Sequence, residues 1–181
     1  MSKDRFEMCF AGSGGQGVIL ASIIFAEAAI LAGKQTMQSQ SYGPEARGGA
    51  CCAECIVGEN RLFYTKMGNP AFMLALTDMA LNKYIGRLAP GGTLVMDADM
   101  QIPERTDAKI YALPILRTAS EKVGKAMTAN IVAVGAINSI LHLFDDEILF
   151  EAVKAHIPAG TEDINLKAFE AGKELGASVG A

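Results

Sequence analysis

Short apolar runs alternate with longer apolar or amphipathic stretches along the first two thirds of the chain. The runs have the length and composition of buried strands. They occupy residues 5–11, 72–76, 93–96 and 109–113, and a more polar candidate lies at 35–40. Between the candidate strands 5–11 and 35–40, residues 18–32 predict a helix that is apolar almost all round. Such a helix is typically buried on more than one side. Gly33 follows as its C-cap. The chain therefore begins with a β-α-β unit.

The middle and end of the sequence extend this pattern. Residues 50–57 and 61–66 predict two strands joined at Gly58–Asn60, which indicates a β-hairpin, and 78–88 predicts an amphipathic helix. Four further helices are expected at residues 115–126, 129–143, 145–155 and 165–176. Strands alternating with helices predict one α/β domain spanning residues 1–181. We expect a Rossmann-like, mostly parallel sheet with helices on both faces and a β-hairpin insertion.

Composition narrows the possible classes of protein. Half of the 181 residues are hydrophobic, yet the most apolar window, 130–144, is shorter than the roughly 20 residues of a membrane span. The first residues contain no signal-peptide core. A cytoplasmic protein with no membrane partner is expected, and the apolar surplus predicts contact with other proteins and self-association of the isolated chain. The net charge of −4, with no basic stripe, argues against nucleic acid as a partner.

The four cysteines are candidate metal ligands that the pattern disfavours. They are Cys9, Cys51, Cys52 and Cys55. Cys52 and Cys55 have the two-residue gap of a metal site, but side chains alternate between the faces of a strand, so the two thiols should point to opposite sides. Neither His142 nor His156 stands at ligand spacing. We interpret the cysteines as small buried hydrophobic residues and expect no metal site on this chain.

A glycine-rich turn, Gly12–Gly17 (GSGGQG), follows the first strand and opens the first helix. In this context glycines let backbone amides approach a phosphate, and the helix N-terminus adds partial positive charge. A dinucleotide site also needs an acidic residue roughly 20 positions further on. Residues 35–40 contain none, which argues against NAD. The alternative is that Gly12, Gly14 and Gly17 only permit a tight turn.

A second motif, Ser41–Gly49 (SYGPEARGG), follows the second candidate strand. In a doubly wound sheet it rises beside the glycine turn, at the edge where ligands bind. Tyr42, Glu45 and Arg47 supply an aromatic ring, a carboxylate and a guanidinium. The alternative is a surface loop with an internal Glu45–Arg47 ion pair.

The two motifs together predict a cofactor-binding rim, and we expect no catalytic residue on this chain. The candidate cofactor-binding residues are Gly12, Gly14, Gly15, Gln16, Gly17, Ser41, Tyr42, Gly43, Glu45, Arg47 and Gly48. Asp97 and Asp99 end a strand near the same edge, where capping of the next turn and contact with a ligand are both possible.

The pairing of these two motifs resembles the gamma subunits of 2-oxoacid:ferredoxin oxidoreductases, in the 2-oxoglutarate and general 2-ketoacid branch. The resemblance covers nearly the whole chain. It implies that residues 1–181 form one pyruvate/ketoisovalerate oxidoreductase gamma-type domain. It includes the Pro90–Gly92 turn before an Asp-bearing strand and the ending Asn165–Gly172. Beta subunits of indolepyruvate oxidoreductases are similar in fold and motif and remain an alternative.

The resemblance implies a complex that oxidatively decarboxylates a 2-oxoacid to acyl-CoA and CO2 and reduces ferredoxin. It implies thiamine diphosphate, magnesium, iron–sulfur clusters and coenzyme A in that complex, with alpha and beta subunits as partners. This chain lacks the thiamine diphosphate metal segment and the cysteine framework of a ferredoxin domain. We therefore expect no cofactor held by this chain alone and no activity without its partners.

Two further functions stay open at this point. A free-standing nucleotide-binding dehydrogenase would hold an adenine nucleotide as a single chain. A purely structural assembly module would use the glycine motifs only to shape the fold. The sequence does not identify which 2-oxoacid the complex would use.

Overall fold

Six strands form one sheet in the computed structural model, which describes residues 5–41, 49–63 and 66–179. The strands are β1 (Arg5–Ser13), β2 (Gln35–Ser41), β3 (Ala50–Gly58), β4 (Phe72–Ala75), β5 (Thr93–Asp97) and β6 (Lys109–Leu113). Their order is β2-β3-β1-β4-β5-β6. β1, β4, β5 and β6 run parallel, whereas β3 is antiparallel to both of its neighbours. The sheet is therefore mixed.

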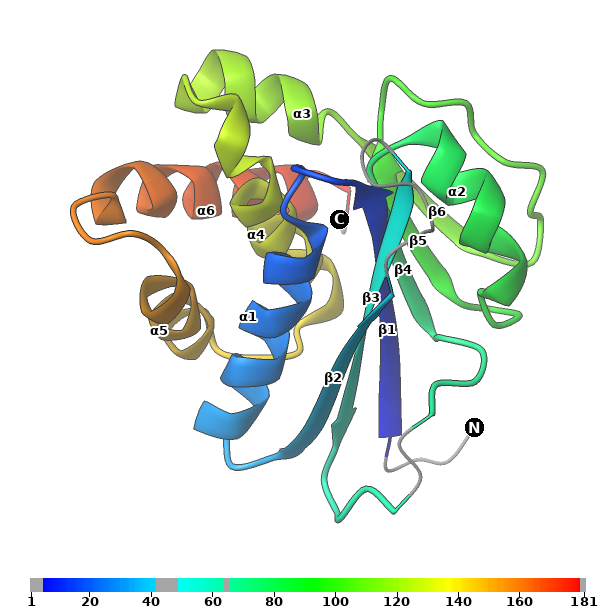
Figure 1. Cartoon of the computed structure of the whole chain (residues 1–181). Coiled ribbons are helices and arrows are strands. Elements are labelled where there is room, and N and C mark those ends of the chain that lie inside the picture. Colours follow the sequence, from blue (N-terminus) through cyan, green and yellow to red (C-terminus); the bar gives the residue numbers. More distant parts are fainter. Residues whose placement is uncertain (1–4, 42–48, 64–65, 180–181) are drawn as a thin grey trace.

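Helices cover both faces of this sheet (Figure 1). One face carries α1 (Val18–Leu31), α4 (Ala129–Leu141), α5 (Asp146–His156) and α6 (Glu162–Ala177). The other carries the short α2 (Asp78–Tyr84), continued by the 3-10 turn η1 (Ile85–Arg87). Between β6 and α4 lie α3 (Ile115–Arg117), the π-helical segment η2 (Thr118–Val123) and the 3-10 turn η3 (Ala126–Thr128). The predicted α/β class with helices on both faces is confirmed.

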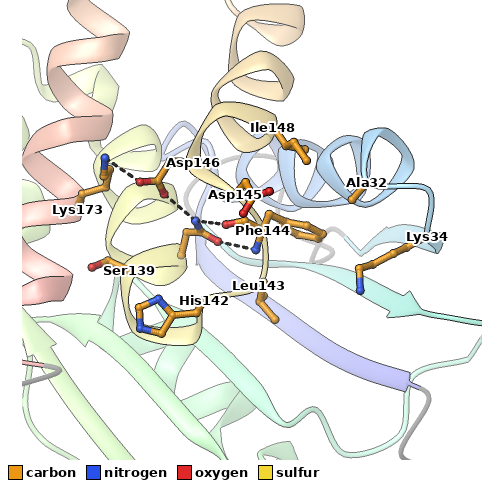
Figure 2. A pocket seen from close by; sticks show the side chains of 11 residues that line it. Ala32, Lys34, Ser139, His142, Leu143, Phe144, Asp145, Asp146, Ile148 and Lys173 are labelled. Atoms are coloured by element: carbon orange, nitrogen blue, oxygen red, sulfur yellow. Dashed lines mark hydrogen bonds and ion pairs between the residues drawn. The ribbon is translucent and has the colours of Figure 1, made fainter.

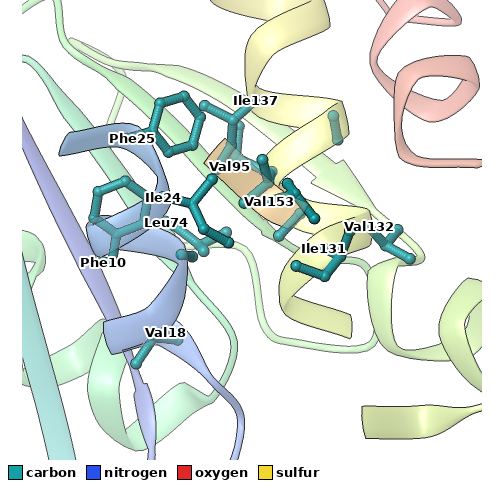
Figure 3. Close-up of a cluster of buried hydrophobic side chains, with 14 of the residues drawn as sticks. Phe10, Val18, Ile24, Phe25, Leu74, Val95, Ile131, Val132, Ile137 and Val153 are labelled. Atoms are coloured by element: carbon teal, nitrogen blue, oxygen red, sulfur yellow. The ribbon is translucent and has the colours of Figure 1, made fainter. Parts of the chain in front are cut away.

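Alternation along the central strands divides the core into two hydrophobic clusters. On the α1 side, Phe10 packs against Phe25 with ring centroids 5.6 Å apart, and Leu74, Val95 and Ile137 join the same cluster (Figure 3). On the α2 side, the cluster contains residues of β1, β3, β4 and β5 together with α2. Each strand of the sheet centre is thus buried on both sides.

The predicted β-hairpin of residues 50–57 and 61–66 is wrong. Residues 61–63 and 66, the described part of the predicted strand 61–66, are not in a strand. β3 instead pairs over its whole length with β1 on one side and along seven residues with β2 on the other. Both edges of β3 are therefore occupied, and no pairing position is left for the segment that follows it.

The expected helix at 115–126 is also not continuous. It begins as a single α-turn, widens into η2 and ends at Gly124, whose φ of 88° is left-handed. By contrast, α4, α5 and α6 lie close to their expected ranges. Among the described residues no helix is long and apolar enough to cross a membrane.

Candidate functional site

The glycine turn connects the end of β1 to the first residue of α1. Within it, the Gln16 N–H donates to the Ser13 carbonyl oxygen at 3.2 Å. Gly15 and Gly17 have φ values of 96° and 71°, in the left-handed region that favours glycine. Gly17 is the N-cap of α1 and offers no side-chain cap. The backbone N–H groups at the start of α1 consequently face the turn without an intrahelical acceptor.

The side chain of Gln16 holds the turn in place. Its Oε1 accepts from the Ser13 N–H at 2.8 Å, and its Nε2 donates to the Leu76 carbonyl oxygen at 3.2 Å. Leu76 directly follows β4, the strand next to β1. Both polar atoms of the Gln16 side chain thus make hydrogen bonds within the protein.

The glycines of the motif have different surroundings. A Cβ at Gly12 would lie 2.7 Å from Gln16 Oε1 and 2.8 Å from Val18 Cγ1, and one at Gly17 would lie 2.6 Å from Asn130 Nδ2. These two positions need glycine for packing. Gly14 is exposed, and a Cβ there would meet nothing within 4 Å. Gly14 and Gly15 are the glycines left facing the solvent.

A cavity of about 460 Å³ opens at this turn. Its floor is the glycine turn and the first residues of α1, and its wall is apolar. The lining residues are Ser13, Gly14, Gly15, Gly17, Val18, Ile19, Leu20, Ile23 and Cys51. Cys51 donates its thiol to the Gly12 carbonyl oxygen at 3.4 Å, and burial raises its pKa, so this sulfur stays protonated. Free amides and the helix dipole favour an anion here, with an apolar chain along the wall.

The second motif leaves the sheet at the same edge. Ser41 ends β2 opposite Cys52, and β3 begins at Ala50, which lies opposite Ser13. Both anchors of the loop therefore stand at the edge that carries the glycine turn. Of the candidate residues, Ser41 is exposed, and Tyr42, Gly43, Glu45, Arg47 and Gly48 lie outside the described residues.

The structure shows what two further residues near this edge contact. Asp97 is 1% exposed, and its carboxylate accepts the N–H groups of Leu116 at 2.8 Å and Asp99 at 3.1 Å, so it caps the turns that follow β5. Asn130, which was not among the predicted site residues, packs against Gly17 and is 95% buried. α4 carries two amides, Asn130 and Asn138, among mostly apolar residues, and an amide in its first turn was the signal that could have identified Asn130.

Asn130 also lines a smaller cavity of about 170 Å³ beside the first turn of α1. Leu20 lies between this cavity and the one at the glycine turn. His156 reaches the smaller cavity, and its buried Nε2 makes no hydrogen bond to the described residues, with Glu27 Oε2 3.9 Å away. This cavity could not be predicted from sequence patterns, because its residues come from four separate segments.

A larger cavity, about 600 Å³, lies at the other end of α1 (Figure 2). Its lining includes Ala32 and Lys34, which places it roughly 20 Å from the glycine turn by the 14-residue length of α1. Its polar groups bind one another: Lys173 Nζ lies 2.8 Å from Asp146 Oδ2, and Asn138 Nδ2 donates to Asp146 Oδ1 at 3.0 Å. These contacts fix the α4–α5 connection.

The cysteines alternate as predicted. Cys51 and Cys55 join the α1-side cluster, whereas Cys52 joins the α2-side cluster with Cys9. Within the described ranges, His, Cys, Asp and Glu side chains form no group of three that could hold a metal ion.

The Rossmann-like domain with its glycine turn belongs to a defined family. Residues 7–175 match the family described as pyruvate ferredoxin/flavodoxin oxidoreductase, so the chain is a member of that family. It is 42% identical over 179 residues to the 2-oxoglutarate synthase subunit KorC of Methanothermobacter marburgensis, covering 94% of this chain and 96% of that subunit. The indolepyruvate oxidoreductase subunit IorB of Archaeoglobus fulgidus, at 25% identity with 93% and 94% coverage, is a more distant relative.

Solved structures agree with this assignment. The gamma subunit of a keto/oxoacid ferredoxin oxidoreductase from Geobacter sulfurreducens superimposes with a TM-score of 0.86 at 41% identity, covering 96% of this chain and 99% of that one. A 2-oxoglutarate:ferredoxin oxidoreductase chain from Magnetococcus marinus, solved with 2-oxoglutarate, coenzyme A and succinyl-CoA bound, shares the fold. That match has a TM-score of 0.89 at 22% identity and covers 98% of this chain but 32% of the longer one. The chain is thus a homologue of gamma subunits, and this origin is favoured over the indolepyruvate branch.

Proposed function

We propose that this chain is the gamma-type subunit of a 2-oxoglutarate:ferredoxin oxidoreductase. The complex would decarboxylate its 2-oxoacid oxidatively, transfer the acyl group to coenzyme A and reduce ferredoxin. Identity to KorC subunits over nearly the full chain supports 2-oxoglutarate as the substrate. Alpha and beta subunits would carry thiamine diphosphate, magnesium and the iron–sulfur clusters, and the chain alone would be inactive.

The observation that carries a role in coenzyme A binding is the cavity at the glycine turn. Its unpaired amides at the start of α1 suit a phosphate group, and the apolar wall of Ile19, Leu20 and Ile23 suits the chain that extends from it. Coenzyme A combines these two features in one molecule. The coenzyme A and succinyl-CoA bound by the Magnetococcus marinus enzyme support the same ligand class.

Arg47 is proposed to complete this rim from the second loop. Because both ends of the loop leave the sheet beside the glycine turn, we expect the guanidinium to reach a ligand held there. A guanidinium holds a phosphate or carboxylate through two parallel hydrogen bonds, which a lysine does not reproduce. Glu45 would orient Arg47.

The test is a coenzyme A titration of the reconstituted complex. Arg47→Lys is expected to fold and assemble but to lower activity, and Arg47→Ala to lower it further. A hydrogen bond to a charged group is worth about 1.5–3 kcal/mol, which corresponds to a roughly tenfold to hundredfold fall in rate. Glu45→Gln should have a smaller effect. Gly14→Ala adds a methyl group in front of the amides without a clash, so it should raise the KM for coenzyme A.

Gly86→Ala is the matched control, since it also adds a methyl group to an exposed glycine in open space, on the α2 side of the sheet. Each variant must co-elute with its partners before rates are compared. If Arg47→Ala and Gly14→Ala assemble and turn over like the wild type, the two motifs are scaffolding and the chain is a structural assembly module.

A further inference from the structure

Two cysteines of neighbouring strands meet on the α2 side of the sheet, away from the glycine-turn cavity. Cys9 of β1 and Cys52 of β3 are 0% and 1% exposed, and their Sγ atoms lie 3.0 Å apart. In the antiparallel ladder, Cys9 lies opposite Glu54 and Cys52 lies opposite Ala11. The two thiols are therefore diagonal neighbours on one face, with side chains that lean towards each other.

The other two cysteines have no such partner. Cys51 donates to the Gly12 carbonyl oxygen, and Cys55 lies 3.8 Å from the Thr36 hydroxyl, both on the α1 side of the sheet. Of the four cysteines, Cys9 and Cys52 are thus the two whose sulfur atoms are in direct contact. Their separation exceeds a disulfide bond, about 2.05 Å, by only about 1 Å.

The surroundings of the pair divide the two thiols into a nucleophile and a proton donor. The hydrogen bond with Cys9 lowers the pKa of Cys52, burial and Glu54 raise it, and Arg87 lowers it. For Cys9, the hydrogen bond with Cys52 and burial both raise the pKa. Arg87 and Glu54 face the pair as an ion pair with a contact of 2.6 Å, and Tyr84 packs against the same cluster. Cys52 is therefore the better thiolate and Cys9 stays protonated beside it.

We propose that Cys9 and Cys52 are a redox modification site that closes into a reversible intramolecular disulfide on reaction with a peroxide. This inference rests on the positions of the two sulfur atoms and is independent of the proposed function.

The reaction balances in two steps. The Cys52 thiolate attacks one peroxide oxygen, so an S–O bond forms, the O–O bond breaks and the departing hydroxide takes up the proton that Cys52 released. The sulfur of Cys9 then attacks Sγ of Cys52, so the S–S bond forms, the S–O bond breaks and the second hydroxide takes the Cys9 proton. Two thiols lose two electrons, and one peroxide becomes two waters.

The fold limits the oxidant to a small molecule and favours reduction of the disulfide back to two thiols. The pair lies under α2 and η1, short elements of seven and three residues, so a small peroxide can enter on a local opening. A link between diagonal positions spans about 7–8 Å between Cα atoms, wider than the usual ~4.4–6.8 Å. Closure therefore pulls β1 against β3, and a strained bond of this kind is readily reduced.

The experiment treats the folded full-length chain with hydrogen peroxide and follows its intact mass and free thiols. The mass should fall by two hydrogen atoms, and the four thiols should fall to two, with dithiothreitol restoring both. The variant Cys51→Ala/Cys55→Ala keeps only the proposed pair and should lose the same mass. Cys52→Ala, which changes one residue of the pair, should form no intramolecular link.

Three results would overturn the proposal. The first is a native chain that keeps all four thiols, and the second is oxygen addition at Cys52 without a link to Cys9. The third is a Cys51→Ala/Cys55→Ala chain that gains no cross-link while remaining folded by circular dichroism. This last variant decides the matter even if Cys52→Ala does not fold, because it leaves Cys9 and Cys52 unchanged.

Discussion

Gln16 connects the glycine turn after β1 to the segment that follows β4 through one side chain. Its amide oxygen accepts from the Ser13 N–H, and its amide nitrogen donates to the carbonyl of Leu76, beyond the neighbouring strand β4. A Cβ on Gly12 would lie 2.7 Å from the amide oxygen of Gln16. The shape of the turn therefore depends on this residue, although it contributes no polar group to the cavity.

We expect Gln16→Ala to destabilise the chain by about 1–3 kcal/mol, because two hydrogen bonds worth about 0.5–1.5 kcal/mol each are lost. Urea denaturation followed by circular dichroism measures the change. Gln101→Ala, at an exposed position where only the backbone N–H is bonded, serves as the control and should be neutral. Equal urea midpoints for Gln16→Ala and Gln101→Ala would contradict a stabilising role for the Gln16 side chain.

The glycine pattern alone could not assign roles to its members. The sequence marks Gly12, Gly14 and Gly17 equally, but at position 17 a left-handed φ of 71° favours glycine and Asn130, far along the chain, leaves no room for a Cβ. The contact with Asn130 is tertiary, so spacing within the motif does not contain it. What the sequence did predict is the strand-turn-helix context and the common edge of the two motifs, because both follow from strand direction.

At the level of elements, α4 and α6 pack with their backbones in contact. A Cβ at Gly172 would lie 2.0 Å from the Val132 carbonyl oxygen, and one at Gly135 would lie 2.2 Å from the Phe169 carbonyl oxygen. Gly176 faces Ala136 and Ser139 in the same way. Glycine on both helices thus sets their separation, which in turn positions the N-terminal end of α4 and its Asn130 against the glycine turn.

We expect Gly172→Ala to destabilise the fold, although alanine has the higher helix propensity. The added methyl group would overlap backbone atoms, and overpacking of this kind typically costs about 1–3 kcal/mol. Thermal unfolding followed by circular dichroism provides the measurement, with Gly86→Ala, in open space, as the control. A melting temperature for Gly172→Ala at or above that of the wild type would show that the helices can separate freely.

Most elements were predictable because local pattern and burial agree there. β6 has the predicted bounds, and α1 ends one residue earlier than expected. The exceptions depend on long-range partners. β3 pairs with β1 and β2 instead of the segment after it, and the predicted helix at 115–126 forms a π-helical segment before Gly124. Neither outcome is encoded in the local alternation of residues.

Across the whole molecule, the apolar surplus is largely internal. Residues 129–138 of α4 are all buried, with α6 packed along α4, so this helix presents little unused apolar surface. α1 is likewise covered by the sheet, α4 and α5 except at the glycine-turn cavity and near its end, where Ile30 and Leu31 are 57% and 51% exposed. These two residues adjoin the cavity lined by Ala32, Leu143 and Ile148. Any apolar contact with a second copy should therefore centre on this end of α1.

The isolated chain is expected to self-associate through this end of α1, since an adjacent exposed pair beside a partly apolar cavity gains from burial. Sedimentation velocity over a range of concentrations should show species heavier than the monomer. The double variant Ile30→Ser/Leu31→Ser should shift the distribution towards monomer. Met127→Ser, which removes a residue 82% exposed near the other end of α1, should not. A wild-type chain that sediments as one monomeric species at high concentration would contradict self-association, and the exposed end of α1 would then be available only to the partner subunits.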